Sequence, residues 1–315
     1  MPLKRFKRLY KDLRLHAAVR NVSTPPLDPD DAPCPTGATD LRIAWPERYD
    51  WALAIKWVGP LMWEFGKTAP LLPVPIPQPY RGVVLFEVEH RGRTHRIAID
   101  YADRTAIHQT CAAEVSLYFK MQFDAAGYDE GNVVPGGFVP ADSSLYEQLG
   151  ELRRMRERQS PATDVYGRFG AQLGRDIRSQ AVQLLREQSR FGFEGGLRKV
   201  SYGKSLQEVA RSRVCIDLPG NGPLCFRLVE YLAVGACVIA YPHRARLPVA
   251  LTDRVNIIYC REDLSDLVEL CEHFVRDQDH GRRVGAAAQD YFDRHLHRRN
   301  LARYYLETIL ARAVG

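Results

Sequence analysis

The chain has 315 residues, of which 45% are hydrophobic and 26% are charged, and its formal net charge is +6. This length is enough for two α/β domains, and this composition is ordinary for a globular protein, which excludes a fibrous or low-complexity chain. So small a positive excess suits an anionic substrate and an anionic surface equally well.

The chain contains seven cysteines, an odd number with no paired C-x-x-C spacing. Several lie in apolar runs, so we interpret them as small buried hydrophobic residues in a reducing compartment and not as a disulfide framework or a zinc site. No apolar run approaches the roughly 18 residues of a membrane span, and no signal-peptide core follows the basic start. The sequence therefore predicts a cytoplasmic protein.

Residues 1–40 are predicted to form a basic N-terminal segment followed by a linker. Residues 1–20 combine Lys and Arg with apolar residues near helical spacing. Two interpretations remain open, a helix on an anionic membrane face and a helix packed on the adjoining domain. In the proline-rich linker, Asp28-Pro29-Asp30 imitates an Asp-x-Asp metal motif, but no apolar strand leads into it. No metal site is predicted there.

Residues 41–160 are predicted to form a first α/β domain with antiparallel pairing. Two strand-like runs flank His90-Arg91-Gly92, which is a hairpin signal. Gly59-Pro60 is expected to break the segment 49–65, and the prolines of 70–79 exclude a long helix there. The expected strands are 41–45, 83–89, 93–100, 114–123 and 133–134.

A polar, Arg-rich helix over 143–159 and a break at Pro161 place the boundary of a second domain, 161–315. Strands and helices alternate from there on, which is typical of a parallel sheet. The expected strands are 164–169, a short one within 191–200, 214–218, 237–240 and 256–260. The expected helices are 177–189, 206–212 (which Ser205 can cap), 224–234, 264–275 and a long tract over 282–312, broken around 295–300.

The stretch 201–243 holds the most informative pattern. Gly220, Asn221 and Gly222 follow a short apolar strand and form a turn that tolerates positive φ and exposes backbone N–H groups. The helix that follows ends at Gly235, its expected C-cap. A glycine turn between a strand and a helix N-terminus suits a diphosphate, although an ordinary βαβ unit with a tight turn has the same pattern.

Arg227 and Glu230 are three residues apart on one face of that helix, close to the glycine turn. The guanidinium of Arg227 can contact a phosphate with two hydrogen bonds, and the carboxylate of Glu230 can accept hydrogen bonds from a ribose diol. The alternative is an intrahelical ion pair on a solvated face.

The order of strand, Gly-x-Gly, Arg-x-x-Glu, helix, glycine, apolar strand and Leu247-Pro248 resembles the nucleotide-sugar half of GT-B glycosyltransferases, most closely the exostosin-like branch. The resemblance covers 202–266, about a fifth of the chain. It implies two Rossmann-like domains that face each other across a cleft, joined by a C-terminal crossover helix. The implied activity is sugar transfer from a nucleotide-sugar, which is a substrate and not a cofactor, to a glycan, lipid-linked or other acceptor in polysaccharide biosynthesis.

We expect Arg168, at the end of the second domain's first strand, and Arg198 and Lys199 to complete the donor site. Cationic side chains and backbone N–H groups at strand ends can stabilise a diphosphate leaving group without a metal. Surface solvation is the alternative for these side chains.

The general base of an inverting transfer is expected in the first domain. Asp100 and Asp103 follow an apolar strand and are the first candidates, with His108 as the next. Turn formation or helix capping is the alternative role of each. Many retaining members of the fold have a second Glu eight positions before the one that matches Glu230, and this chain has Gly222 there, which favours inversion.

A second class of function also fits the sequence, a non-catalytic module that binds a polyanion or a membrane through residues 1–20 and the Arg-rich helices. Its basic residues are dispersed among acidic ones and no RNA- or DNA-binding motif is present, so we expect no nucleic acid partner.

Overall fold

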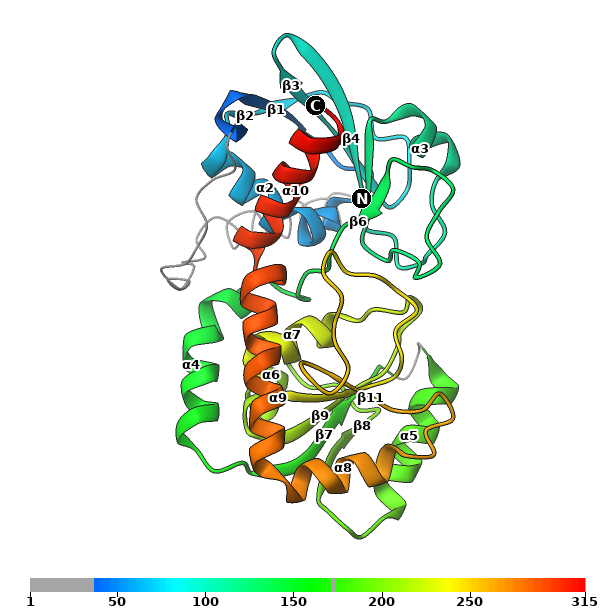
Figure 1. Cartoon of the computed structure of the whole chain (residues 1–315), viewed down its shortest axis with the longest axis vertical. Helices are drawn as coiled ribbons and strands as arrows, with labels where there is room; N and C mark the ends of the chain where they lie inside the picture. The colour runs from blue at the N-terminus through cyan, green and yellow to red at the C-terminus, as the bar shows by residue number, and fades with distance from the viewer. Residues whose placement is uncertain (1–36, 171–173, 315) are drawn as a thin grey trace, which may run out of the picture. The chain divides into compact units, whose positions relative to one another are not determined.

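The computed structural model describes residues 37–170 and 174–314 (Figure 1). The basic segment 1–20, most of the linker and Asp28-Pro29-Asp30 lie outside the described residues. The chain divides into two compact units. Unit 1 contains 37–147, Ala245–Pro248 and 296–314, and unit 2 contains Gln148–Arg244 and Val249–His295.

This division differs from the expected ranges 41–160 and 161–315 at three places, one of which is the short segment Ala245–Pro248 that groups with unit 1. Most of α4 (Ser144–Arg158) groups with unit 2, because Arg153 donates hydrogen bonds to Asp293 at 2.7 and 3.0 Å and to Ala233 O at 2.9 Å. Residues 296–314 group with unit 1. The acceptor and donor roles of the two domains stay predictions.

Unit 1 is built on a mixed sheet with strand order β2-β1-β3-β4-β5-β6. The antiparallel pairs β1–β3 and β3–β4 confirm the expected pairing, and the remaining neighbours are parallel. At the hairpin, Arg91 and Gly92 have φ of 49° and 75°, as a type I′ turn requires. The strands are β1 (Leu41–Pro46), β2 (Leu71–Val74), β3 (Val83–His90), β4 (Arg93–Asp100), β5 (Leu117–Lys120) and β6 (Val133–Pro135).

The expected break at Gly59-Pro60 is wrong, because α2 (Ile55–Thr68) continues through Pro60. Proline removes one helical hydrogen bond, but Val58, Leu61 and Phe65 are all buried, so core packing stabilises the continuous helix. The expected strand 114–123 is also shorter in the structure. Its first residue, Glu114, ends helix α3 (Gln109–Glu114), and the strand itself is β5 (Leu117–Lys120). The other helical segments of unit 1 are η1 (Ala38–Asp40), η2 (Ala52–Ala54), α3 (Gln109–Glu114) and α10 (Arg298–Arg312).

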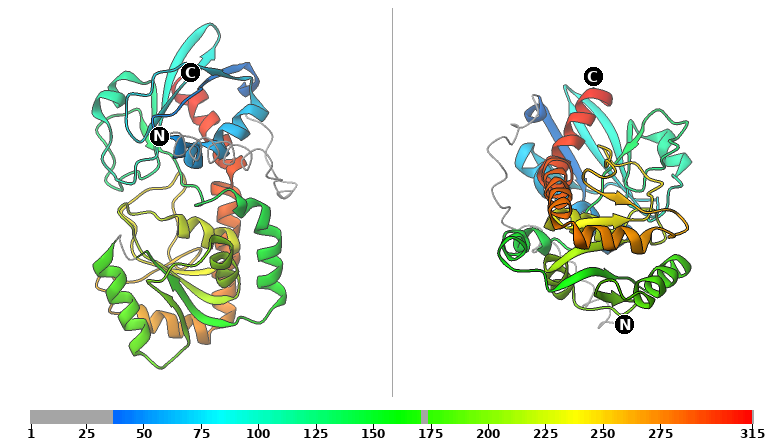
Figure 2. Two further views of the ribbon diagram at one scale, coloured as in Figure 1. Left: turned by 180° about the vertical axis from the view of Figure 1, so that it is seen from behind. Right: turned by 60° about the horizontal axis from the view of Figure 1, so that its bottom comes forward.

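Unit 2 contains a parallel sheet with strand order β11-β10-β9-β7-β8. Helices α5 and α8 cover one face of this sheet and α6, α7 and α9 the other (Figures 1 and 2). The strands are β7 (Thr163–Arg168), β8 (Phe193–Gly196), β9 (Ser212–Asp217), β10 (Cys237–Ala240) and β11 (Ile258–Tyr259). The helices are α5 (Arg175–Glu187), α6 (Tyr202–Ala210), α7 (Phe226–Val234), α8 (Leu267–Arg276), α9 (Gln278–Tyr291) and the π-turn Phe292–Leu296.

The α/β prediction is therefore confirmed in both units. Gly235 caps α7 with φ of 81°, as expected. Ser205 is not a cap, because α6 begins one turn earlier with Ser201 at its N-cap, and the hydroxyl of Ser205 instead lies 2.9 Å from that of Tyr166. Among the residues that the structure describes, no helix is both long enough and apolar enough to cross a membrane.

Candidate functional site

The strand order of unit 2 reverses between β7 and β9, so these neighbouring strands connect onward in opposite directions across the sheet. In open parallel sheets, ligands bind outside the carboxyl ends of the strands at such a reversal. The strand residues at this point are Arg168, at the end of β7, and Asp217, at the end of β9. Ligand-binding groups are therefore expected around these two residues.

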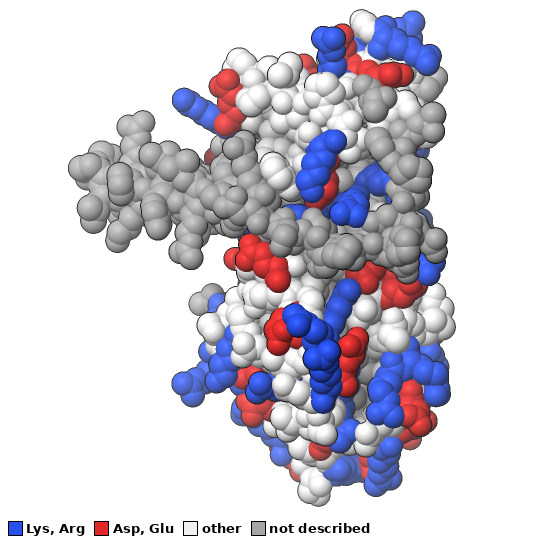
Figure 3. Space-filling model, turned by 90° about the vertical axis from the view of Figure 1, so that its left-hand side faces the viewer, with Lys and Arg blue, Asp and Glu red and all other residues white. Residues whose placement is uncertain are grey.

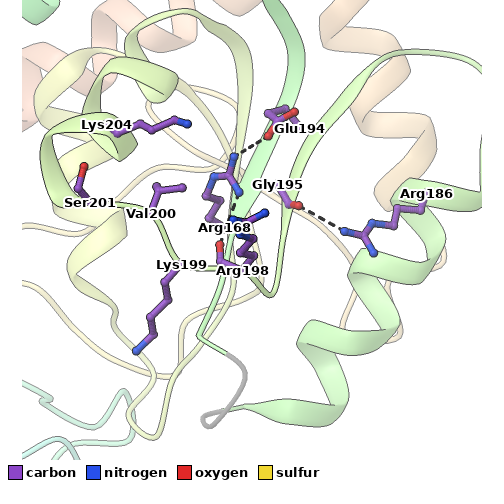
Figure 4. A pocket seen from close by; sticks show the side chains of 9 residues that line it. All are labelled: Arg168, Arg186, Glu194, Gly195, Arg198, Lys199, Val200, Ser201 and Lys204. Atoms are coloured by element: carbon purple, nitrogen blue, oxygen red, sulfur yellow. Dashed lines mark hydrogen bonds and ion pairs between the residues drawn. The ribbon is translucent and has the colours of Figure 1, made fainter.

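A pocket of about 610 Å³ opens beside the ends of β7 and β8. We call it the cationic pocket, since five of the residues that line it are Arg or Lys and one is Glu (Figure 4). It brings together the predicted residues Arg168, Arg198 and Lys199. Its lining residues are Arg168, Arg186, Glu194, Gly195, Arg198, Lys199, Val200, Ser201 and Lys204.

Arg168 is the least exposed Arg or Lys of this pocket, and two carboxylates balance its charge. Its Nε donates to Glu208 Oε2 at 2.6 Å and its Nη2 to Glu194 Oε1 at 2.5 Å. The hydrogen bond to Glu208 raises the pKa of Arg168 above its ordinary value. Arg198 and Lys199 are exposed, and within the described ranges neither forms an ion pair. Arg198 and Lys199 are therefore the exposed positive charges of the cationic pocket that the sequence analysis predicted, and their binding of an anion stays a prediction.

A second group of charges, the Asp217 cluster, consists of Asp217, Arg227 and His243 at the carboxyl ends of β9 and β10. Asp217 is 1% exposed, and its carboxylate lies 3.6 Å from Arg227 Nε and 3.5 Å from His243 Nε2. Arg227 Nη2 also donates to the carbonyl of Leu218 at 2.7 Å. Arg227 is thus held beside the strand end by Asp217 and Leu218, and its role in phosphate binding stays a prediction.

Arg178 of α5 adds another buried positive charge and is a residue that the sequence analysis missed. It is 2% exposed and donates to Gly170 O at 2.9 Å, and its pKa is lowered by burial and by the nearby Arg227. The guanidinium groups of Arg178 and Arg227 lie 5.9 and 5.1 Å from the ring centroid of Phe169. The sequence does contain a pattern that predicts the burial of Arg178. This residue has helical spacing with Ala181, Val182 and Leu185 and so lies on the apolar face of its helix.

The glycine turn differs from its prediction. Gly220 does not adopt a positive φ, and its N–H donates to Gly222 O at 3.2 Å. The helix that follows begins at Phe226 and not at residue 224, with Cys225 at the N-cap. The turn therefore closes on itself through a backbone hydrogen bond, and the prediction that its amides bind a phosphate stays a prediction.

Glu230 is the fifth residue of α7 and is 5% exposed. The alternative of an ion pair on a solvated face does not apply to it, because a buried carboxylate is surrounded by protein and needs hydrogen-bonding partners. Its predicted contact with a ribose stays a prediction.

Asp100 in unit 1 is 2% exposed and fully engaged. It accepts hydrogen bonds from Lys120 Nζ at 2.9 Å, Tyr118 Oη at 2.6 Å and the backbone N–H of Ala102 at 2.8 Å. Burial lowers the pKa of the Lys120 ammonium, and the Asp100 carboxylate acts against that shift. This environment makes Asp100 a partner of a buried cation and leaves it no access to an acceptor.

Asp103 lies beyond the strand end and is exposed, with one carboxylate oxygen 2.8 Å from Gln122 Nε2. His108 is half-buried, and its ring lies 5.1 Å from that of Tyr80. Asp103 lines a pocket of unit 1 together with Trp51 and Tyr101.

The prediction that no metal takes part stays a prediction. Among the residues that the structure describes, His273, Asp277 and His280 have potential ligand atoms within 4.8 Å of one another. This group lies at the junction of α8 and α9, and the carboxylate of Asp277 already accepts the N–H of His280 as an N-cap, at 3.0 Å. It is not part of the site described above.

Residues 176–310 match the family model described as glycosyl transferase-like. The comparison with curated proteins gives no match. One similar solved structure is a glycosyltransferase from Rickettsia africae ESF-5, with 10% identity, a TM-score of 0.42, and coverage of 64% of this chain and 66% of that one. Another is Anabaena Alr3699/HepE in complex with UDP-glucose, with 16% identity, a TM-score of 0.40, and coverage of 65% and 68%. These TM-scores are low, and the matched part is less than two thirds of the Rickettsia chain.

Proposed function

We propose that this protein is a glycosyltransferase that moves a sugar from a nucleotide-sugar donor to a glycan, lipid-linked or other acceptor. The observation that carries the proposal is the concentration of cations at the topological reversal of the unit 2 sheet, within the glycosyl transferase-like domain. Arg198 and Lys199 of the cationic pocket and Arg227 of the Asp217 cluster lie at that edge. A diphosphate is the anion that such a strand edge and helix N-terminus suit.

In the proposed reaction an acceptor hydroxyl oxygen forms a bond to the anomeric carbon of the donor sugar. The bond between that carbon and the diphosphate oxygen breaks, and the nucleoside diphosphate leaves with the electron pair. The hydroxyl proton passes to a carboxylate base. Negative charge grows on the leaving group in the transition state, so Arg and Lys held at the diphosphate accelerate this step.

The proposed roles follow from position. Lys199, Arg198 and Arg227 hold the diphosphate, Arg168 supports them, and Glu230 holds the ribose diol. Because these side chains supply positive charge, the proposal requires no metal. The inverting course is supported by Gly222, which stands where many retaining enzymes have a carboxylate. Asp103 is the proposed base, since Asp100 is buried with Lys120.

The finer features of the resemblance belong to this proposal: exostosin-like specificity, transfer of a hexose or pentose, a role in polysaccharide biosynthesis, and action on the cytoplasmic side. They rest on the motif order from Tyr202 onward.

The direct test is a thermal-shift panel of UDP-, GDP-, ADP-, CDP- and dTDP-sugars, starting with UDP-glucose, the ligand of the Anabaena structure. A ligand that binds the folded state raises the melting temperature, and at a given concentration a tighter ligand raises it more. We expect one nucleotide to stabilise the protein with EDTA present, and this nucleotide-sugar to release its nucleoside diphosphate when an acceptor is added. Absence of any nucleotide response would remove the proposal.

The alternative, a module that binds polyanions or membranes, has less support from the described surface. On the face shown in Figure 3, Lys and Arg alternate with Asp and Glu and form no continuous basic area. Salt-sensitive binding to heparin or to anionic vesicles without a nucleotide response would favour this alternative. Flotation with vesicles, with and without residues 1–20, tests the N-terminal segment separately.

A further inference from the structure

Unit 1 contains a pocket of about 540 Å³ that the donor chemistry does not use. We call it the aromatic pocket, because three aromatic side chains form its wall and charged side chains form its rim. The residues that matter here are Trp51, Trp57, Tyr101, Asp50, Arg81 and Asp103.

The three aromatic rings form a stack with one accessible end. Trp51 and Tyr101 have ring centroids 6.3 Å apart at an interplanar angle of 23°, and Trp57 and Tyr101 have centroids 5.9 Å apart at 25°. Trp57 and Tyr101 are buried, whereas Trp51 is 46% exposed. An exposed Trp supported by two buried rings keeps its orientation without burying its own surface, which is typical of a binding platform.

The rim of the aromatic pocket is polar and its charges balance. Asp50, Asp103 and Arg81 are exposed, as is Arg104, and the carboxylate of Asp103 is oriented by Gln122 at 2.8 Å. Arg81 is placed beside the stack by the next residue, Gly82, whose carbonyl accepts the N–H of Tyr101 at 2.9 Å. Because the two carboxylates offset the two guanidinium groups, the rim offers a polyphosphate no net positive charge.

We infer that the aromatic pocket binds a gluco-configured pyranose ring of a glycan. Such a ring has its hydroxyls in the equatorial plane and its C–H bonds on the two faces. A C–H face packs on the negative face of the Trp51 indole, as the quadrupole of that ring favours. The equatorial hydroxyls then reach the carboxylates of Asp50 and Asp103, which accept charge-assisted hydrogen bonds.

This inference rests on the proposed function for its place in catalysis, where it identifies the acceptor as a glycan with gluco-configured residues. Asp103 borders the aromatic pocket and is also the proposed base. A sugar stacked on Trp51 therefore presents a hydroxyl to the carboxylate that removes its proton.

Glycan binding can be measured on the whole protein without any donor. We would record saturation-transfer NMR and tryptophan fluorescence with cellotetraose, chitotetraose and mannotetraose. We expect cellotetraose or chitotetraose to bind and mannotetraose, whose 2-hydroxyl is axial, to bind more weakly. Trp51→Ala should weaken binding about tenfold or more, and Trp51→Phe, which keeps a ring, should recover most of it.

Trp63→Ala is the matched control, because Trp63 is a half-buried residue of α2 outside the aromatic pocket. Its glycan affinity should equal that of the parent. Binding to none of the three glycans, or equal binding by parent and Trp51→Ala, would overturn the inference.

A separate titration with the nucleotide-sugar distinguishes this inference from the proposed function. Glycan binding that depends on Trp51, with no nucleotide binding, would leave the pocket as a carbohydrate-binding site and remove the transferase proposal. Nucleotide binding together with glycan binding that ignores Trp51 would remove only the present inference.

Discussion

Nε of Arg227 lies 3.6 Å from Oδ1 of Asp217, and both groups are at the carboxyl end of β9. A buried carboxylate at this point fixes the direction of a guanidinium that would otherwise be repelled by the neighbouring Arg178. The pair therefore stabilises a concentration of positive charge where the sheet topology favours ligand binding.

Replacing Asp217 with Asn should weaken binding of the nucleoside diphosphate about tenfold, because Arg227 loses the charge that orients it. Isothermal titration of the parent and the variant measures the effect. Asp164→Asn is the matched control, since Asp164 belongs to the same sheet but pairs with Arg213 at 3.2 Å near the start of β7. Equal loss in both variants would indicate a general effect on the sheet.

Glu230→Gln should also weaken nucleotide binding by roughly tenfold or more, since a ribose diol loses charge-assisted hydrogen bonds worth about 1.5–3 kcal/mol each. Deoxyribose analogues of the nucleotide should show a smaller difference between parent and variant. Circular dichroism provides the folding control, because Glu230 is buried. A variant that binds the nucleotide as the parent does would show that Glu230 has only a structural role.

Lys199→Met removes one exposed cation from the cationic pocket. We expect diphosphate affinity to fall about tenfold at low ionic strength and less at high salt, because exposed charges are screened. The melting temperature should stay unchanged, as for most surface substitutions. Arg276→Met, an exposed change on α8 outside this pocket, is the control. Affinity that is independent of Lys199 would place the diphosphate elsewhere.

The two aspartates after β4 should behave differently. Asp103→Asn should lower kcat about a hundredfold or more with unchanged nucleotide affinity and stability, because an exposed general base is lost. Asp100→Asn should instead destabilise the fold by about 3–5 kcal/mol, because Lys120 is left buried without its counter-charge. Urea unfolding and steady-state kinetics separate the two effects. Full activity of the Asp103→Asn enzyme would show that Asp103 is not the general base, and His108 would become the next candidate.

The free energy of unfolding should fall as the pH rises above about 9. Burial raises the pKa of Cys215, Cys237 and Cys260 from 9.0 to about 12. In the unfolded chain these thiols lose their protons at lower pH, so the folded state binds more protons between about pH 9 and 12. Each thiol contributes a loss of about 1.4 kcal/mol per pH unit in that range.

Urea unfolding at about pH 8, 9.5 and 10.5 measures this decline, and Cys237→Ala should make it less steep. The same free energy at all three pH values would contradict the burial of these thiols.

The second unit could be predicted well from sequence, because its central strands β9 and β10 are buried on both faces and are short apolar runs between helices. The glycine turn was harder to predict. The residue types Gly-Asn-Gly fit an open turn and also a turn that closes through a hydrogen bond from Gly220 N–H to Gly222 O, as the structure has it. Likewise, Pro60 predicted a break, but the apolar residues on either side of it belong to one buried helix face.

Site residues were harder to predict. Arg168, Arg198 and Lys199 follow strands, and their convergence in the cationic pocket could be expected from the parallel order. Asp100 and Asp103 have the same local pattern, and only the tertiary partner Lys120 distinguishes the buried aspartate from the exposed one. The Trp51 stack joins residues from separate segments, which spacing along the chain does not reveal.

The membership of α10 in unit 1 has a consequence for synthesis on the ribosome. The ring of Tyr305, in α10, stacks on that of Phe119 with their centroids 3.9 Å apart, and its hydroxyl donates a hydrogen bond to Gly136 O at 2.7 Å. Tyr305 therefore completes the core of unit 1. Those partners are translated before Tyr305, and unit 2 is translated between them. Domains fold as their residues emerge, so unit 2 can finish folding while unit 1, although translated first, still exposes Phe119. The segment that completes the core of unit 1 is thus made after unit 2, although most of unit 1 is translated first.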